Sequence, residues 1–576
     1  MNNVMLCYAL VFILAFPLGL YLARCLDDSP RASRLDRLFW PIEALLYRLA
    51  GVDAGSGMSW KSYAWAVIKL HVLMIILAWV TFMAQGILPL NPDDIPGMSW
   101  DTALHTAISF ATNTNQQHYS GQAQLSYLSQ TLAIVTLQFV TPATGLAVLV
   151  AIARVLLKRK DAETATDAGA QGNTPIDVGN YYRDLVRTLV RAMLPVAAVV
   201  ALLLSWQGVP STLHGAEVVQ PLDASVSESQ VIPRGPVAAM VAIKQLGTNG
   251  GGWYGPNSSV PLENPTALAN VIETVSLLLF PVALLIAVGV MTGRRRLLFG
   301  IGTVMLVFSL ISTSSAIISE RAPNAAFSGL ALSGSANMEG KELRFGPEMS
   351  ALWGSWTTQT SNGSVNAMHD SFNPMGGLVE LMDMFVNVTF GGVGVGLIGY
   401  LLYLMLAAFI GSLMIGRAPE ILGKPLETRE MRWISLAILA QPLVVLGLTA
   451  ITLAFPSLTG NSNPGFHGLS QVLYEYTSAF ANNGSGFEGL GDDTPWWNLS
   501  CGLALLAGRF LPMLAPLAVA AWLAQKRTAP AGRGTLSMDS AAFAGLTAGV
   551  IVIINLLGFL PVLVMGPVAE QLSLAF

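Results

Sequence analysis

Residues 238–251 read AAMVAIKQLGTNGG, a short apolar stretch that ends in a polar turn with glycine. The apolar part, Ala238–Leu246, is much shorter than the roughly 20 residues a helix needs to cross a membrane. A long apolar run, Ala267–Met291, follows it. The pattern is typical of a re-entrant segment, a half-helix followed by an irregular turn. Such a turn is tolerated at membrane depth only where protein or water satisfies its backbone groups.

Three other parts of the chain share this design. Their apolar stretches are Ala103–Phe110, Ser350–Trp356 and Val472–Phe480. Aligned on the end of the polar run that follows, the four copies read Thr114-Asn115-Gln116, Thr248-Asn249-Gly250, Ser361-Asn362-Gly363 and Asn482-Asn483-Gly484. Any one copy could be a surface turn. Four copies in the same setting predict four repeats of helix, re-entrant loop and helix.

Ten long apolar runs are candidates for membrane-spanning helices. They are Val4–Ala23, Ala64–Gln85, Leu125–Leu156, Leu185–Trp206, Ala267–Met291, Leu297–Ile318, Leu378–Ile415, Ile434–Phe455, Leu499–Ala524 and Ala542–Val564. Only 11% of the 576 residues are charged, against about 25% in soluble domains. We expect an all-α integral membrane protein with ten transmembrane helices. Four pseudo-repeated helix–pore loop–helix units would surround one central pore, with one extra helix at each end.

The predicted repeats divide the chain into six parts. Residues 1–61 hold the first transmembrane helix and a basic cytoplasmic loop, and residues 62–160 hold pore repeat 1. Residues 161–293 combine a cytoplasmic loop with pore repeat 2, and residues 294–416 hold pore repeat 3. Residues 417–526 combine a cytoplasmic loop with pore repeat 4, and residues 527–576 hold the last transmembrane helix and an external C-terminus.

The run Leu378–Ile415 is too long for one straight helix. It contains a series of glycines: Gly391, Gly392, Gly394, Gly396 and Gly399. They indicate a break in the middle of the membrane, where irregular backbone would line protein or a water-filled cavity. Close helix packing through small residues is the alternative, and the sequence leaves both open.

The distribution of Lys and Arg orients the chain. Most of the 30 basic residues fall in the loops of one side, and the other side keeps only Arg234, Arg321, Lys341 and Arg344. Basic residues mark cytoplasmic loops, so we expect both termini outside. The outside loops are acidic, which would attract cations, although each acid could be an ordinary loop charge. These acids are Asp93, Asp94, Asp101, Glu217, Asp223, Glu228, Glu263, Glu348, Asp370, Glu488, Asp492 and Asp493.

The four polar loops predict a cation filter. Four re-entrant loops around one axis would direct backbone carbonyls at a common centre, and rings of carbonyls can replace the hydration shell of a potassium ion. Glycine permits the dihedral angles that such a loop needs. Each half-helix would point the negative end of its dipole toward the cation.

Several kinds of site are not supported. The sequence contains no GxxxxGK[ST] phosphate loop and no DKTGT-like phosphorylation string, so ATP hydrolysis would need a partner chain. Cys7, Cys25 and Cys501 form no CxxC pair, and the histidines show no metal-binding spacing, so we expect loop or pore-helix histidines rather than metal ligands. No basic tract suits nucleic acid.

Lys244, inside a half-helix, would snorkel or pair with an acid.

Longer strings carry a family resemblance. They are ATNTNQQHYSGQ (111–122), LGTNGGGWYGPNSSVPLENPT (246–266), SNGSVNAMHDSFNPMGG (361–377), GRAPEILGKPLETREM (416–431) and YTSAFANNGSGFEGL (476–490). The chain resembles the potassium transporter superfamily that includes the Trk- and Ktr-type channel subunits. Within it, the chain is most similar to the family of potassium-binding A subunits of the Kdp pump, a potassium-transporting P-type ATPase complex of bacteria. The resemblance covers essentially the whole chain.

The resemblance implies a transport subunit without catalytic activity of its own. Such a subunit binds external or periplasmic potassium and delivers it, by a sideways intramembrane tunnel, to a P-type ATPase subunit for high-affinity uptake. The implied partners are the catalytic (B) subunit, the C subunit and the small F subunit of the Kdp complex, together with membrane lipid and without nucleic acid. Potassium is the implied substrate, no organic cofactor is expected, and the implied location is the bacterial inner membrane.

The resemblance also implies the filter residues. They are Thr112, Asn113, Thr114, Asn115, Gln116, Gly247, Thr248, Asn249, Gly250, Thr360, Ser361, Asn362, Gly363, Ala481, Asn482, Asn483 and Gly484. Gln116 stands where the other three loops have glycine, and the resemblance implies that glutamine is usual at this position in the family. Arg509 matches a positive residue of the family's ninth helix and would repel potassium below the filter. A buried structural pair with Glu380 or Asp383 is the alternative for Arg509.

Two other functions are alternatives to the pump subunit. The first is a stand-alone or ATP-gated potassium channel or uptake subunit of the same superfamily. The second is a membrane-embedded enzyme, for which a catalytic constellation is missing, or a secondary transporter, for which more acids in the middle of the membrane would be expected. Gln116, Arg509 and the family strings favour the pump subunit over the channel.

Overall fold

The predicted membrane spans are helical in the structure, a computed structural model that describes residues 2–27, 34–158, 176–223, 229–327, 329–330, 336–528 and 537–575. Ten segments of this part are long and apolar enough to cross a membrane: Asn2–Leu26, Trp60–Ile87, Ser129–Leu157, Tyr181–Gln207, Ala267–Thr292, Arg295–Phe327, Val395–Met414, Thr428–Ala454, Pro495–Gln525 and Ala541–Leu574. The all-α membrane fold with ten spans is confirmed, and the repeat relation stays a prediction. The predicted boundary at 160/161 and Glu228 lie outside the described residues.

The elements follow one another along the chain with connections of very different length. The helices are α1 (Asn2–Leu26), α2 (Arg34–Ala50), α3 (Trp60–Ala84), α4 (Trp100–Ala111), α5 (Gly121–Gln124), α6 (Val135–Ile152), α7 (Tyr181–Arg187), α8 (Leu194–Gln207), α9 (Val237–Leu246), α10 (Ala267–Thr292), α11 (Arg295–Arg321), α12 (Gly346–Gln359), α13 (Pro374–Val386), α14 (Val395–Met414), α15 (Thr428–Ala454), α16 (Phe466–Ala481), α17 (Pro495–Gln525), α18 (Ala541–Leu563) and α19 (Ala569–Ala575). Strands β1 (Glu217–Val219) and β2 (Gln230–Ile232) pair antiparallel, as do β3 (Glu420–Ile421) and β4 (Lys424–Pro425).

Polar caps and glycine turns set several helix ends. Ser59, Thr266 and Thr494 precede α3, α10 and α17, and each side chain accepts a hydrogen bond from a backbone N–H in the first turn. Such a bond satisfies a donor that has no partner inside the helix. Gly208 and Gly293 end α8 and α10 in the left-handed conformation, which glycine adopts without steric cost.

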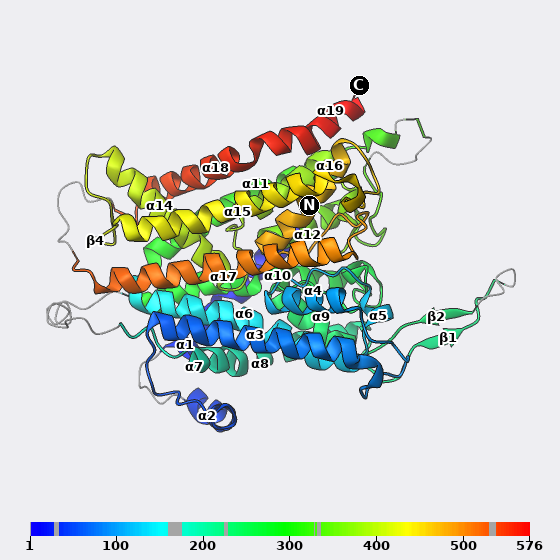
Figure 1. The fold of residues 1–576 in the computed structure, drawn as a ribbon, viewed down its shortest axis with the longest axis horizontal. Coiled ribbons are helices and arrows are strands. Elements are labelled where there is room, and N and C mark those ends of the chain that lie inside the picture. Colours follow the sequence, from blue (N-terminus) through cyan, green and yellow to red (C-terminus); the bar gives the residue numbers. More distant parts are fainter. Residues whose placement is uncertain are drawn as a thin grey trace.

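The spans of α6 and α10 form the centre of the bundle. In both, 83% of the most apolar window is buried, against 28% in the spans of α1 and α3. The peripheral spans therefore present apolar side chains outward, as lipid-facing helices do. In Figure 1 the long helices run side by side, and the short helices α4, α9, α12 and α16 share one half of the molecule. The β1–β2 hairpin projects beyond that half, and both termini lie on it.

The predicted seventh run, Leu378–Ile415, is interrupted in the structure, one of the two outcomes that its glycines allowed. Helix α13 ends at Val386 and α14 begins at Val395. The backbone between them has positive φ at Asn387, Phe390, Gly391 and Gly394. A Cβ atom at Gly394 would lie 2.4 Å from the carbonyl oxygen of Gly145 in α6. The glycines therefore allow the interruption of the helix. They also allow close packing against α6, so both interpretations of the glycine series apply.

Helix α2 was not predicted, because it lies in a segment interpreted as a basic loop. Leu38, Ile42, Leu45 and Leu49 are more than half exposed on it. On another side Glu43 is buried and accepts a hydrogen bond from Arg191 Nη2 at 2.7 Å. Exposed apolar residues on a short amphipathic helix beside a membrane bundle are typical of a helix that lies in the membrane interface.

Candidate functional site

Each of the four short helices ends at one of the predicted polar loops. α4, α9, α12 and α16 are followed by the loops that begin at Thr112, Gly247, Thr360 and Asn482. All four loops share one backbone hydrogen bond, which joins an N–H to the carbonyl five residues earlier. The pairs are Thr114 to Ser109, Asn249 to Lys244, Asn362 to Thr357 and Asn483 to Ser478, at 2.9 to 3.1 Å. The loops therefore leave their helices in the same way.

The backbone dihedral angles correct the alignment of the first loop by one residue. Positive φ angles occur at Thr248 and Gly250, at Ser361 and Gly363, at Asn482 and Gly484, and in the first loop at Asn113 and Asn115. Asn115, and not Gln116, occupies the position of the three glycines. Asn is among the few residues that visit the left-handed region routinely. Gln116 does not have a positive φ, so glutamine is tolerated there without strain.

Hydrogen bonds between neighbouring loops close them into a ring. Asn113 Nδ2 of the first loop donates to Thr248 O of the second at 2.8 Å. Asn362 Nδ2 of the third loop donates to Lys244 O beside the second at 2.9 Å. Asn483 Nδ2 of the fourth loop donates to Thr357 O beside the third at 2.8 Å. Asn482 Nδ2 donates back to Thr114 Oγ1 of the first loop at 3.0 Å. The four predicted loops, separated widely in sequence, thus meet around one centre.

The glycines of the ring face carbonyl oxygens of the next loop. A Cβ atom built on Gly250 would lie 1.8 Å from Asn362 O, and one built on Gly363 would lie 2.1 Å from Asn483 O. A Cβ atom on Gly484 would lie 2.1 Å from Thr114 O. These distances leave no room for any side chain. Glycine is therefore required here both by the positive φ angle and by the neighbouring backbone.

Each loop has at least one carbonyl group without a protein donor. In the part of the chain that the structure describes, the carbonyl oxygens of Thr114, Asn249, Asn362 and Asn483 accept no hydrogen bond. All four residues are buried. Buried carbonyls without a partner are uncommon in proteins and call for a ligand. Carbonyl oxygens are hard ligands, which suit alkali and alkaline-earth cations rather than soft metals.

A cavity of about 670 Å³ opens onto the ring. Asn115, Gln116, Gly250, Gly363 and Gly484 line it at the ring. Of the acids predicted to attract cations, Glu488 and Asp492 line the same cavity, together with Glu475. We call this cavity the vestibule. The Oδ2 atom of Asp492 lies 3.9 Å from His118 Nε2.

A second, smaller cavity of about 70 Å³ joins the ring to the broken seventh span. Ser361 and Asn482 of the ring line it, together with Asn387 and Gly392 of the break and Arg509. Two hydrogen bonds join the residues of the broken segment to the ring. Ser361 Oγ donates to Asn387 Oδ1 at 2.6 Å, and Val393 N donates to Thr248 Oγ1 at 3.0 Å. We call this space the side cavity.

Arg509 is a buried cation without a carboxylate partner among the described residues. Its side chain is 2% exposed, and its Nη2 atom donates to Thr141 O of α6 at 2.7 Å. The alternative of a pair with Glu380 or Asp383 is wrong. Glu380 lies 3.2 Å from His369 Nδ1, and Asp383 accepts from Ser312 Oγ at 2.5 Å. Arg509 therefore places an uncompensated positive charge beside the side cavity.

Lys244 pairs with an acid, one of the two outcomes that the sequence allowed. Its ammonium group donates to Glu263, to Asn257 Oδ1 at 2.6 Å and to Ser258 Oγ at 2.7 Å, and the residue is completely buried. Asn257 Nδ2 in turn donates to Gly250 O at 2.6 Å. This buried hydrogen-bond network stabilises the conformation of the second loop.

Sequence reasoning missed the residues that support the ring from outside the loops. Asn257, Asn387 and Glu475 each hydrogen-bond to a loop residue. Asn257 and Glu263 lie within the string 246–266, and their nearness to the second loop in the sequence was the only indication of a supporting role. Nothing in the sequence pairs Glu475 with Gln116, because 359 positions separate them.

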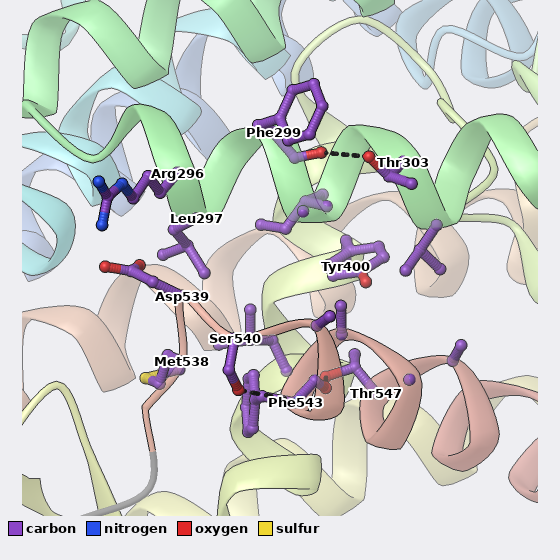
Figure 2. A pocket seen from close by; sticks show the side chains of 18 of the residues that line it. Arg296, Leu297, Phe299, Thr303, Tyr400, Met538, Asp539, Ser540, Phe543 and Thr547 are labelled. Atoms are coloured by element: carbon purple, nitrogen blue, oxygen red, sulfur yellow. Dashed lines mark hydrogen bonds between the residues drawn. The ribbon is translucent and has the colours of Figure 1, made fainter.

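A further cavity of about 760 Å³ lies between α11, α14 and α18, away from the ring. Figure 2 shows the side chains of Phe299, Tyr400 and Phe543 around it and those of Arg296 and Asp539 at one end. No predicted filter residue lines this cavity. It is therefore not part of the candidate site.

Known proteins resemble this chain over nearly its whole length. A family model described as potassium-transporting ATPase A subunit matches residues 5–572. A relative from Gloeobacter violaceus is 44% identical over 568 residues, which cover 96% of this chain and 95% of the relative. One from Pseudomonas putida is 46% identical over 538 residues, covering 93% and 92%. One from Synechocystis sp. is 44% identical over 558 residues, covering 97% and 96%.

All three relatives carry the name potassium-transporting ATPase potassium-binding subunit. A solved structure, the potassium transporter TrkH from Vibrio parahaemolyticus, aligns with a TM-score of 0.49 and 15% identity over 89% of this chain and 98% of that chain.

Proposed function

The chain belongs to the family of potassium-transporting ATPase A subunits, and we propose that its ring of four loops binds potassium for delivery to a partner ATPase. In this function the chain is a transport subunit, and ATP is hydrolysed on another chain. The observation that carries the proposal is the closed ring, in which each loop contributes at least one buried residue, Thr114, Asn249, Asn362 or Asn483, whose carbonyl oxygen has no protein donor among the described residues. Such carbonyls can replace the hydration shell of a potassium ion.

The cavities suggest how an ion reaches and leaves the ring. The acidic side chains of the vestibule raise the local concentration of cations, and the ring then takes up the dehydrated ion. The uncompensated charge of Arg509 lies beside the side cavity and repels a cation that moves straight on. The broken seventh span provides irregular backbone at the same place, which is tolerated where it lines a cavity. We infer a sideways route through this cavity toward the partner.

The partner and the location follow from the family. A subunit of a potassium-transporting ATPase works with an ATPase chain, and we propose the catalytic (B), C and small F subunits of the Kdp complex. The protein is a multi-pass membrane protein, which we place in the bacterial inner membrane with both termini external. Both termini lie on the half of the molecule that carries the vestibule, in agreement with entry of potassium from outside.

Thermal unfolding in different salts tests the binding site. A ligand that binds only the folded protein stabilises it by about 2.7 kcal/mol at a concentration of 100 Kd. We expect the purified chain in detergent to melt at a higher temperature in potassium chloride than in sodium chloride at equal ionic strength. Gly363→Asp should lose this difference, because a carboxylate would enter the ring of carbonyls. A potassium-specific shift that persists in Gly363→Asp would contradict the site.

A further inference from the structure

His118, Glu475 and Cys501 meet at one wall of the vestibule, although they come from three different elements. His118 follows α4, Glu475 belongs to α16 and Cys501 to α17. One potential ligand atom of each lies within 4.8 Å of the other two, and all three residues are buried. His118 Nε2 is 3.2 Å from Glu475 Oε1. The sequence offered no metal signal here because 357 positions separate the histidine from the carboxylate.

A hydrogen bond behind His118 fixes the orientation of its ring. Asn498 Nδ2 donates to Asp101 Oδ2 at 3.1 Å, so the oxygen of the same amide is available to His118. His118 Nδ1 lies 2.8 Å from this oxygen and donates to it. The ring also stacks on His105 at a centroid distance of 3.8 Å. Nε2 therefore faces Glu475 and Cys501, in the arrangement that metal-binding histidines adopt.

The cluster borders the vestibule. His118, Glu475 and Asp492 line that cavity, whereas Cys501 does not line it and is completely buried. The Asp492 side chain is 27% exposed, and its Oδ2 atom is 3.9 Å from His118 Nε2. Asp492 can therefore reach a fourth coordination position, or a water molecule can fill it.

The ligand set selects a class of metal. Imidazole nitrogen, thiolate sulfur and carboxylate oxygen in four-coordinate geometry suit zinc and similar divalent ions, whereas magnesium, calcium and potassium prefer oxygen ligands alone. A thiol binds zinc as the thiolate, so binding releases its proton to solvent. We propose that His118, Glu475 and Cys501 form a binding site for a zinc-class divalent cation at the wall of the vestibule.

Occupancy of this metal site would weaken potassium binding at the ring. This effect rests on the proposed function. Gln116 Nε2 donates to Glu475 Oε1, and Gln116 lines the mouth of the ring. A metal ion that takes Glu475 as a ligand withdraws that acceptor from Gln116. It also adds positive charge to the vestibule. Both effects weaken potassium binding, so the ion acts as an inhibitor of uptake.

Cadmium provides a direct readout of the site, because cadmium–thiolate bonds absorb in the ultraviolet. We expect the full-length chain, purified without potassium, to bind about one equivalent of Cd²⁺ with this absorption and to bind Zn²⁺ in competition. Cys501→Ser should lose the absorption, and His118→Gln should weaken binding roughly tenfold or more. Cys7→Ser is the matched control, since Cys7 is equally buried in α1 away from the cluster.

The same samples separate this site from the ring. Absorption that persists in Cys501→Ser, or wild-type protein that binds no Cd²⁺, would overturn the proposal. Gly363→Asp should still bind Cd²⁺, so loss of potassium binding alone leaves the metal site standing. Zn²⁺ should reduce the potassium-induced thermal shift in the wild type and not in Cys501→Ser. An equal shift with and without bound Zn²⁺ would overturn the inhibitory effect.

Discussion

Gly250, Gly363 and Gly484 each meet two constraints at once. Their φ angles are positive, and each faces a backbone carbonyl of the next loop where a Cβ atom would clash. A clash with backbone cannot be relieved by a change of rotamer. The ring therefore tolerates no side chain at these positions, whatever its chemistry.

Replacing Gly363 with Ala should weaken potassium binding roughly tenfold or more, equivalent to about 1.4 kcal/mol. The new methyl group would push Asn483 O away from its place in the ring. Isothermal titration with potassium measures the change. Gly465→Ala is the matched control: its φ is 89° and nothing lies within 4 Å of the new Cβ. An equal loss of potassium affinity in both variants would contradict the role of the ring.

Replacing Asn115 with Val should destabilise the protein more than replacing Gln116 with Val. Asn115 has a φ of 55°, and a β-branched residue in the left-handed region costs about 1–3 kcal/mol. Asn115→Val should therefore lower the melting temperature and disturb the ring. Gln116→Val should keep the backbone and lose only the hydrogen bond to Glu475. A larger loss of stability in Gln116→Val would restore the original alignment, in which Gln116 replaces a glycine.

At the scale of elements, the long spans were predictable, because twenty apolar residues in a row are visible in a sequence. The glycines from Gly391 to Gly399 indicated a break without excluding close packing. Helix α2 was missed although its sequence carries a signal: Leu38, Ile42, Leu45 and Leu49 recur at helical spacing, a pattern that mean hydropathy does not register. The sequence also could not show which buried polar residues meet, because Asn387, Glu475 and His118 find their partners across the fold.

The contact between α16 and α19 should depend on pH. His467 lies 2.8 Å from both Asp370 Oδ1 and Glu570 Oε1. Burial alone would lower the pKa of His467, but these hydrogen bonds outweigh it and raise the pKa from 6.5 to about 10. The protonated histidine therefore stabilises the fold fully below about pH 6.5, and this stabilisation is lost as the pH rises through about 10.

Melting curves of wild type and His467→Gln check this dependence. The difference in melting temperature should be largest below about pH 6.5 and should shrink toward about pH 10. Limited proteolysis at Glu570 should report release of α19 over the same range. A difference that stays constant with pH would show that His467 contributes by packing alone.

At the scale of the whole molecule, the proposed function makes the chain a binding chamber that does not conduct ions straight through. The vestibule leads to the ring, the side cavity lies beside the broken span, and Arg509 lies at its wall. The ring was predictable because its residues lie together in four recognisable loops. The side cavity was not, because its lining comes from residues as distant as Ser361, Gln441 and Pro512.

Removing the charge of Arg509 should increase leakage more than it changes binding. In Arg509→Gln, we expect potassium affinity to change less than about tenfold, while passive rubidium flux into liposomes that contain the chain rises. Arg429→Gln, which removes a charge at the start of α15, should leave the flux unchanged. Flux at the wild-type level in a folded Arg509→Gln protein would contradict the role of this charge.

Delivery of potassium to a partner ATPase is tested by rubidium uptake into cells that lack their own potassium systems. The chain is expressed alone and then together with its proposed ATPase partners, with Gly363→Asp as the inactive variant. We expect concentrative, ATP-dependent uptake only when the partners are present, and none with Gly363→Asp. Substantial uptake by the chain alone would contradict the pump-subunit function and would identify a channel.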